Sequence, residues 1–237
     1  MKLVKVSLLV FIFSISICAQ WYFQNPYPTE NNLNSVKFVN PELGWAVGEF
    51  GTILKTTDGG NNWFNIASGT TENLQSIYFI NDSLGFISGW NGTLLKTTDG
   101  GDTWGNQSSG SNEHLLTICF VNDSIGYISG IDGVLLKTTD GGSSWFIQNS
   151  DINISIPRIC FTSENVGYAV GLDGMFTKTT DAGLSCVSQN MGTQNQLINI
   201  SFIDSNTGFI VGKFGLIYKT TDSGINWTNK VTGSIAK

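Results

Sequence analysis

The sequence predicts an all-β protein: a β-propeller of five four-stranded blades. Three observations lead to this prediction. A unit of 41 residues occurs five times without insertion over residues 33–237, and each unit holds four segments of strand length. No window shows the sustained 3.6-residue hydrophobic period of a helix. Short antiparallel strands that recur at a period of about 40 residues are typical of propeller blades.

Composition and charge exclude several classes of protein. Charged residues make up only 13% of the chain and hydrophobic residues 41%, which excludes a disordered polyelectrolyte and a coiled coil. The formal net charge is −6 and Arg158 is the single arginine. Binding to nucleic acid or to an anionic membrane surface needs clustered basic residues, so neither is expected.

The N-terminal residues 1–19 read as a secretory signal peptide. Lys2 and Lys5 precede an apolar stretch from Val6 to Ile17, and small residues follow. Cleavage after Ala19 predicts a secreted, periplasmic or cell-surface protein that is not inserted in a membrane, with residues 20–237 forming a single propeller domain. The three remaining cysteines and the one histidine indicate neither a disulfide framework nor a metal site, and no cofactor is predicted.

Residues 20–32 form a prefix that resembles the end of a blade. The sequence WYFQNPYPTENNL at 21–33 aligns with WFNIASGTTENL at 63–74, which predicts an extra outer strand. In a closed ring this strand would compete with the outer strand of the last unit. We favour a closed five-bladed monomer, and the alternative is an open five-blade arc that can pair with another copy.

The five repeats span 33–73, 74–114, 115–155, 156–196 and 197–237. In the first repeat, the expected strands are LNSVKF at 33–38, GWAVG at 44–48, TILKTT at 52–57 and a fourth that starts at Trp63. Dipeptides of the type Asn-Gly, Asp-Gly or Phe-Gly join the second strand to the third in every repeat. Such two-residue connections predict tight hairpins with positive φ at both positions.

Each repeat also carries the pattern T-x-D-x-G-x-x-W, or a close variant, between its third and fourth strands. The aspartate can accept backbone N–H bonds from the residues that follow, and the tryptophan can pack back over the hairpin. We therefore interpret these residues as structural, and the lysines that precede them as repeated surface residues. The fourth repeat has Cys186 in place of the tryptophan, which predicts the least well packed blade. The structural residues are Asp58, Asp99, Asp140, Asp181, Asp222, Trp63, Trp104, Trp145 and Trp227.

These units resemble Asp-box, or BNR, repeats. With the GWAVG step ahead of KTTDGGNNW, they resemble the repeats of the photosystem II stability/assembly factor-like propellers, and the resemblance covers residues 33–237. It implies a non-catalytic propeller that acts as an assembly scaffold and binds a protein partner.

Residues that vary between the repeats are the candidates for binding a ligand or partner. They lie at the tips of the hairpins between the second and third strands, where exposed aromatic side chains are unusual for a soluble surface. Arg158, on an innermost strand, is a further candidate. The tip candidates are Glu49, Phe50, Trp90, Asn91, Ile131, Asp132, Leu172, Asp173, Lys213 and Phe214.

Two other functions remain as alternatives. Trp90 and the Asn and Asp tips suit a carbohydrate-binding propeller, since an aromatic ring can stack on a sugar. A glycoside hydrolase would need two carboxylates about 5–10 Å apart. The candidates are Glu49, Asp132 and Asp173 at the tips, and Glu72 and Glu113 in the connections. A sialidase is excluded because its substrate carboxylate calls for an arginine cluster. No catalytic residue is assigned, and we predict that the protein is not an enzyme.

Overall fold

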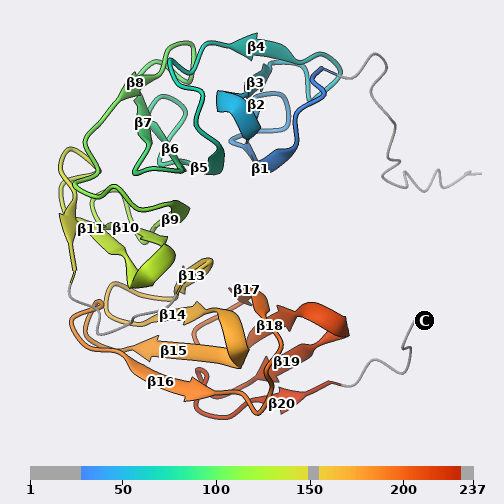
Figure 1. The fold of residues 1–237 in the computed structure, drawn as a ribbon, viewed down its shortest axis with the longest axis vertical. Coiled ribbons are helices and arrows are strands. Elements are labelled where there is room, and N and C mark those ends of the chain that lie inside the picture. The colour runs from blue at the N-terminus through green and yellow to red at the C-terminus, as the bar shows by residue number, and fades with distance from the viewer. Residues whose placement is uncertain (1–27, 149–154, 231–237) are drawn as a thin grey trace, which may run out of the picture.

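The computed structural model describes residues 28–148 and 155–230, which form five four-stranded antiparallel sheets (Figure 1). The fold class predicted from the sequence is thereby confirmed. The predicted signal peptide, residues 20–27 of the prefix and residues 149–154 lie outside the described residues. Residues 28–32 of the prefix, predicted as part of an extra outer strand, form no strand.

Each sheet, or blade, has its four strands in sequence order. The blades comprise β1 (Leu33–Phe38), β2 (Gly44–Gly48), β3 (Ile53–Thr56) and β4 (Phe64–Ile66); β5 (Leu74–Phe79), β6 (Gly85–Gly89), β7 (Leu94–Thr97) and β8 (Gly105–Asn106); β9 (Leu115–Phe120), β10 (Gly126–Gly130), β11 (Leu135–Thr138) and β12 (Phe146–Ile147); β13 (Arg158–Phe161), β14 (Gly167–Val170), β15 (Met175–Thr179) and β16 (Val187–Asn190); and β17 (Leu197–Phe202), β18 (Gly208–Gly212), β19 (Ile217–Thr220) and β20 (Thr228–Asn229).

The blades stand side by side around an arc, with β1, β5, β9, β13 and β17 on its inner side and the fourth strands on its outer side (Figure 1). The second and third strands are joined by 3₁₀ turns at Glu49–Gly51, Ile131–Gly133, Leu172–Gly174 and Lys213–Gly215. In the first of these turns φ is 54° at Phe50 and 67° at Gly51. The tight hairpins expected from the dipeptide pattern are present.

Aromatic stacking holds neighbouring blades together. The aromatic residue of the second strand in one blade lies against the phenylalanine of the first strand in the next. Trp45 stacks on Phe79 with ring centroids 3.9 Å apart, and Tyr127 stacks on Phe161 at 4.0 Å. The Trp45 ring also packs against the backbone of Gly101 in the second blade. A Cβ atom at Gly101 would lie 2.4 Å from the Trp45 indole nitrogen, so glycine is required there.

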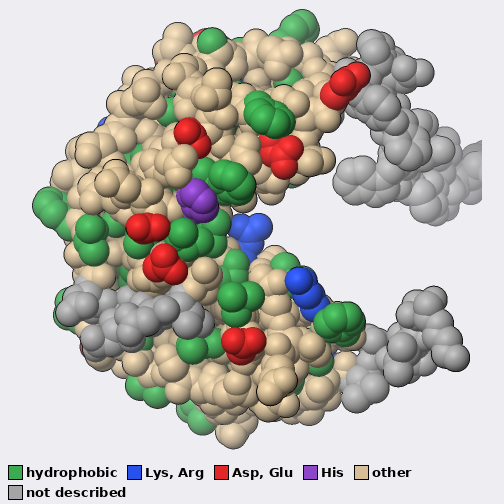
Figure 2. All heavy atoms as spheres, viewed as in Figure 1, with side chains coloured by type: hydrophobic (Ala, Val, Ile, Leu, Met, Phe, Trp, Pro, Cys, Tyr) green, Lys and Arg blue, Asp and Glu red, His purple; other side chains and the backbone are tan. Residues whose placement is uncertain are grey.

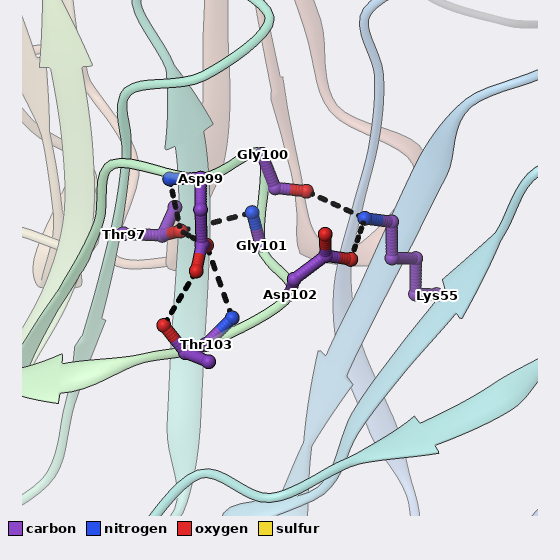
Figure 3. A network of polar contacts seen from close by, with 7 residues as sticks. All are labelled: Lys55, Thr97, Asp99, Gly100, Gly101, Asp102 and Thr103. Carbon is purple, nitrogen blue, oxygen red and sulfur yellow. Dashed lines mark hydrogen bonds and ion pairs between the residues drawn. The ribbon is translucent and has the colours of Figure 1, made fainter.

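The Asp motif fixes the turn between the third and fourth strands, as Figure 3 shows for the second blade. The Thr97 hydroxyl donates to Asp99 at 2.7 Å and accepts from the Gly101 N–H at 2.9 Å. Asp99 also accepts from the Thr103 N–H at 3.0 Å and from its hydroxyl at 2.6 Å. These hydrogen bonds, led by the one from the Thr103 hydroxyl, hold the pKa of Asp99 well below its usual range.

The repeated lysines link one blade to the next, and our interpretation of them as surface residues was wrong. Lys55 donates to the Gly100 carbonyl at 2.8 Å and to Asp102 at 2.6 Å in the second blade (Figure 3). Its ammonium also lies 5.5 Å from the centroid of the Trp45 ring. Corresponding bonds to a carbonyl of the next Asp motif join Lys96 to Gly142, Lys137 to Ala182 and Lys178 to Ser223.

The five blades form an open arc, not the closed ring that we favoured. Figures 1 and 2 show the opening between the first blade, β1–β4, and the fifth, β17–β20. Val36 on β1 is 62% exposed, whereas its equivalent Ile77 on β5 is 5% exposed. The physical reason is that the angle between neighbouring blades is set by their packing, and five such steps do not complete the circle.

The fourth blade is packed differently from the others, as its sequence predicted. Where Trp145 in the third blade packs edge-on against Phe86 and Phe120, the fourth blade has Cys186. A small cavity of about 20 Å³ remains there, with Cys186, Phe161 and Tyr168 in its lining. This space is enough for about one water molecule.

None of the helices among the described residues is long and apolar enough to cross a membrane.

Candidate functional site

The hairpin tips and the connections between blades lie together at one face of the arc. We call this surface the tip face and define it by the ten tip candidates: Glu49, Phe50, Trp90, Asn91, Ile131, Asp132, Leu172, Asp173, Lys213 and Phe214. Figure 2 shows acidic and hydrophobic side chains gathered around the inner part of the arc. The tips and the connections share a face because both lie at the same ends of the strands, and hydrogen bonds join them.

Each tip is fastened to its neighbours by backbone hydrogen bonds. The Glu49 N–H donates to the Asn32 carbonyl in the connection before the blade, and the Gly51 N–H donates to the Glu72 carbonyl in the connection after it, both at 2.9 Å. Trp90 and Gly92 repeat the pattern in the second blade. The tips therefore form a rigid surface, which reduces the entropy lost when a partner binds.

The second blade has the most elaborate tip. The Trp90 ring stacks on the His114 ring with centroids 4.7 Å apart and planes inclined by 10°. The Asn91 N–H donates to His114 Nδ1 at 3.1 Å, and the Asn91 side chain donates to Glu72 at 2.8 Å. The Trp90 ring thus covers one side of the His114 ring, and Trp90 itself remains 38% exposed.

Phe50 and Phe214 have the most exposed aromatic side chains of the tip face, at 68% and 87%. Both residues are in the left-handed region, with φ of 54° and 59°. The equivalent residues of the other blades are Asn91, Asp132 and Asp173, of types that tolerate this conformation. A bulky aromatic residue at positive φ is strained, so the fold itself gives no reason for phenylalanine at these two positions.

The acidic tip residues have a structural explanation. Asp132 and Asp173 are exposed, and each has a φ of 52° as the first residue of an Asp-Gly pair. Aspartate is favoured there because its short side chain suits the left-handed conformation. Among residues 28–148 and 155–230, no group of three or more His, Cys, Asp or Glu side chains could hold a metal ion.

Arg158 is not on a hairpin tip. It lies at the start of β13, opposite Val170 of β14, and is half-buried on the inner side of the arc. The ten tip residues are therefore distributed over the five blades around the arc, and Arg158 lies on an inner strand, opposite a residue two positions before the Leu172 tip. The inter-blade lysines were missed as structural residues because each acceptor lies 45 or 46 residues further along the chain.

Comparison with known proteins gives a family. The sequence matches the family profile described as photosynthesis system II assembly factor YCF48 over residues 15–104, 62–157 and 147–234. No curated protein sequence matches the chain.

Similar solved structures share the fold at low sequence identity. A structure of YCF48 bound to D1 peptide has a TM-score of 0.64 and 17% identity, over 86% of this chain and 83% of that one. YCF48 from Cyanidioschyzon merolae has a TM-score of 0.60 and 16% identity, over 86% of each chain. The GH74 enzyme of Niastella koreensis has a TM-score of 0.68 and 19% identity, over 84% of this chain but only 38% of that enzyme.

Proposed function

The chain belongs to the photosynthesis system II assembly factor YCF48 family, and on this basis we propose that it is a non-catalytic propeller that binds a protein through its tip face. The two strained and exposed phenylalanines, Phe50 and Phe214, carry the proposal. A strained residue that the fold does not require is a reason to infer a function. Aromatic side chains, phenylalanine included, are also enriched at the cores of protein–protein interfaces.

Two further observations support a protein partner. The first two tips are held by backbone hydrogen bonds on both sides, and the fifth is held by the bond from the Lys213 N–H to the Gln196 carbonyl, so these tips are already ordered before binding. A YCF48 structure contains a bound D1 peptide, which makes a peptide segment a reasonable class of ligand for a member of this family. On the basis of the predicted signal peptide, we expect this partner in the cell envelope or outside the cell.

The test compares exposed phenylalanines on the tip face with similarly exposed phenylalanines on the outer strands. Phe50→Asn and Phe214→Asn remove the exposed rings, and asparagine suits the left-handed backbone, so both variants should fold. Phe64→Asn and Phe146→Asn are the matched controls because these rings are similarly exposed on outer strands. Cross-linked pull-down from the native envelope fraction should recover a partner with the wild type and the controls, and much less with the tip variants. Equal recovery with all four variants would contradict the proposal.

A glycan-binding function is favoured by one observation, the Trp90 ring held flat by His114 beside the polar groups of Asn91 and Glu72. A glycan array separates the two functions. Saturable glycan binding that is abolished by Trp90→Ala and kept by Phe214→Asn would replace the protein-binding proposal. No binding to the array, together with a protein partner lost in the phenylalanine variants, is the result we expect.

A further inference from the structure

His114 is the one histidine of the chain, and it lies against the tip of the second blade. It ends the connection between β8 and β9, and its side chain is at the surface, purple in Figure 2. The Trp90 ring stacks on the imidazole, and the Asn91 N–H donates to His114 Nδ1 at 3.1 Å. An imidazole nitrogen that accepts a hydrogen bond carries no proton, so the ring in this arrangement is neutral, with its proton on Nε2.

The first blade makes the same contact with a side chain that does not titrate. Asn73 is the equivalent of His114 one repeat earlier, and the Phe50 N–H donates to its side-chain oxygen at 3.0 Å. Phe50 is the equivalent of Asn91, and the two residues share the left-handed conformation, with φ of 54° and 52°. An amide oxygen remains an acceptor as the pH falls, whereas an imidazole gains a proton near neutral pH. The two tips are therefore held in the same way but should respond differently to pH.

The remaining hydrogen bonds of the second tip do not involve the imidazole. The Trp90 N–H donates to the Asn73 carbonyl and the Gly92 N–H to the Glu113 carbonyl, both at 2.9 Å. These backbone bonds fix the residues on either side of Asn91. Loss of the bond to His114 would therefore free the centre of the turn and leave its two ends in place.

The charged groups around His114 are carboxylates. Glu113 precedes it in the chain, and Asp132 lies on the tip of the third blade, which donates a backbone hydrogen bond to the His114 carbonyl. Glu72 accepts from the Asn91 side chain at 2.8 Å. None of these carboxylates forms an ion pair with His114 in the part of the chain that the structure describes. The two tips and the two connections that carry these residues contain no lysine or arginine, so no positive charge opposes protonation of the ring.

We propose that His114 is a pH-sensitive latch, which holds Asn91 when the imidazole is neutral and releases it when the imidazole is protonated. The imidazolium has two N–H donors and no acceptor. A proton on Nδ1 faces the Asn91 N–H, so this hydrogen bond is lost. The Trp90 ring stays on the imidazolium, because a cation is attracted to the face of an indole. The change is therefore confined to the backbone of Asn91 and to its side chain, which contacts Glu72.

The latch makes one part of the tip face sensitive to acidity. Asn91 belongs to that face, so a lower pH loosens a surface that is ordered at neutral pH. The effect on a bound partner rests on the proposed function, whereas the latch itself is tested on the chain alone. Failure of the latch is therefore distinguishable from failure of the proposed function.

Nuclear magnetic resonance of the isotopically labelled chain tests the latch directly, because the hydrogen bond joins two nitrogen atoms. A scalar coupling passes through such a bond, here between the Asn91 amide nitrogen and His114 Nδ1. We expect the coupling at about pH 8 and its loss at about pH 5, with the midpoint at which the His114 ring titrates. The chain has no other histidine, so the ring signals belong to His114 alone.

Two substitutions that exchange the acceptors of the first and second blades are the matched variants. His114→Asn gives the second tip the acceptor of the first, so Asn91 should keep its bond at both pH values. At about pH 5 the Asn91 amide should exchange its hydrogen about threefold to tenfold faster in the wild type than in His114→Asn, as the loss of one hydrogen bond predicts. The Phe50 amide should exchange equally in these two chains. Asn73→His places the latch in the first blade, and the Phe50 amide should then lose its protection on acidification.

Three results would overturn the proposal. The first is a coupling that is missing at the higher pH or that persists after the His114 ring has gained its proton. The second is equal exchange of the Asn91 amide in the wild type and in His114→Asn at the lower pH. The third is a Phe50 amide that stays protected in Asn73→His when the new histidine is protonated. Circular dichroism at both pH values checks the fold, and His114→Gln serves if His114→Asn is unfolded, since Gln196 occupies the equivalent position before the fifth blade.

Discussion

Replacing Trp145 by alanine should cost the protein a large part of its stability. Trp145 is 7% exposed and packs edge-on against Phe86 and Phe120, with centroids 6.1 and 5.7 Å apart. It therefore contacts aromatic rings of two blades at once. Its indole nitrogen has no hydrogen-bond partner within the described residues, so the loss on substitution is one of packing.

The magnitude follows from the buried area. A tryptophan side chain buries about 150–250 Å², which at about 25 cal/mol per Å² corresponds to about 4–6 kcal/mol. Measured substitutions of large buried aromatic residues by alanine lie at about 3–5 kcal/mol, and we expect Trp145→Ala in that range. Trp63 in the end blade is only partly buried, so Trp63→Ala should cost about half as much. Cys186→Ala, beside the cavity, should cost about 1 kcal/mol or less.

Urea unfolding followed by circular dichroism measures the three values. The slope of the transition reports whether the unfolding unit has changed, and it should be similar in the wild type and the Cys186 variant. A cost for Trp145→Ala below about 1.5 kcal/mol, or one no larger than that of Cys186→Ala, would refute the argument that the tryptophans join the blades.

Three further predictions follow from the contacts between and within blades. Lys137→Met should lower the free energy of unfolding by about 1–2 kcal/mol, because it removes a charged hydrogen bond and a cation–π contact. Lys219→Met should cost less, because among the described residues Lys219 has the cation–π contact with Phe209 but no carbonyl acceptor in a following blade. Equal costs for the two variants in urea unfolding would contradict the role of the lysines in joining the blades. The hydrogen bonds of the Asp motif lower the pKa of Asp181 and Asp222 from their ordinary values to about 2. Because the folded-state pKa is lowered, the stability is fully present above about pH 4 and is lost as the pH falls toward 2; a melting temperature that stays constant from pH 5 to about pH 2 would contradict this. Phe214→Asn should raise the free energy of unfolding by about 0.5–1 kcal/mol in scanning calorimetry, because it relieves the strained backbone. A lower free energy of unfolding would show that the Phe214 ring makes stabilising contacts in the folded protein.

The sequence was sufficient for the blades because each strand and turn is specified locally. The Gly51 position and its four equivalents predict a left-handed residue, and the Asp58 position and its equivalents predict a turn. Both signals depend only on residues within the same repeat. Because the five repeats align without gaps, a strand or turn that is assigned wrongly in one repeat disagrees with the other four.

The closure of the ring could not be predicted in this way. It depends on the angle between neighbouring blades, which arises from packing such as that of Trp45 on Phe79, and no single residue encodes it. The role of Lys55 was hidden for a related reason, since its acceptor at Gly100 belongs to the next repeat. Its register opposite Trp45 in the β2–β3 pair was a usable signal, because it places the ammonium near an inter-blade ring in every unit.

The most direct test of the tip face is to ask which molecules touch it. A phenylalanine analogue that cross-links on irradiation can be placed at Phe50, at Phe214 and, as a control of similar exposure, at Phe64. Irradiation in the native envelope fraction should attach the same protein at positions 50 and 214, and not at 64. The same adduct at all three positions, or no protein adduct at either tip, would contradict the proposal that this face binds a protein.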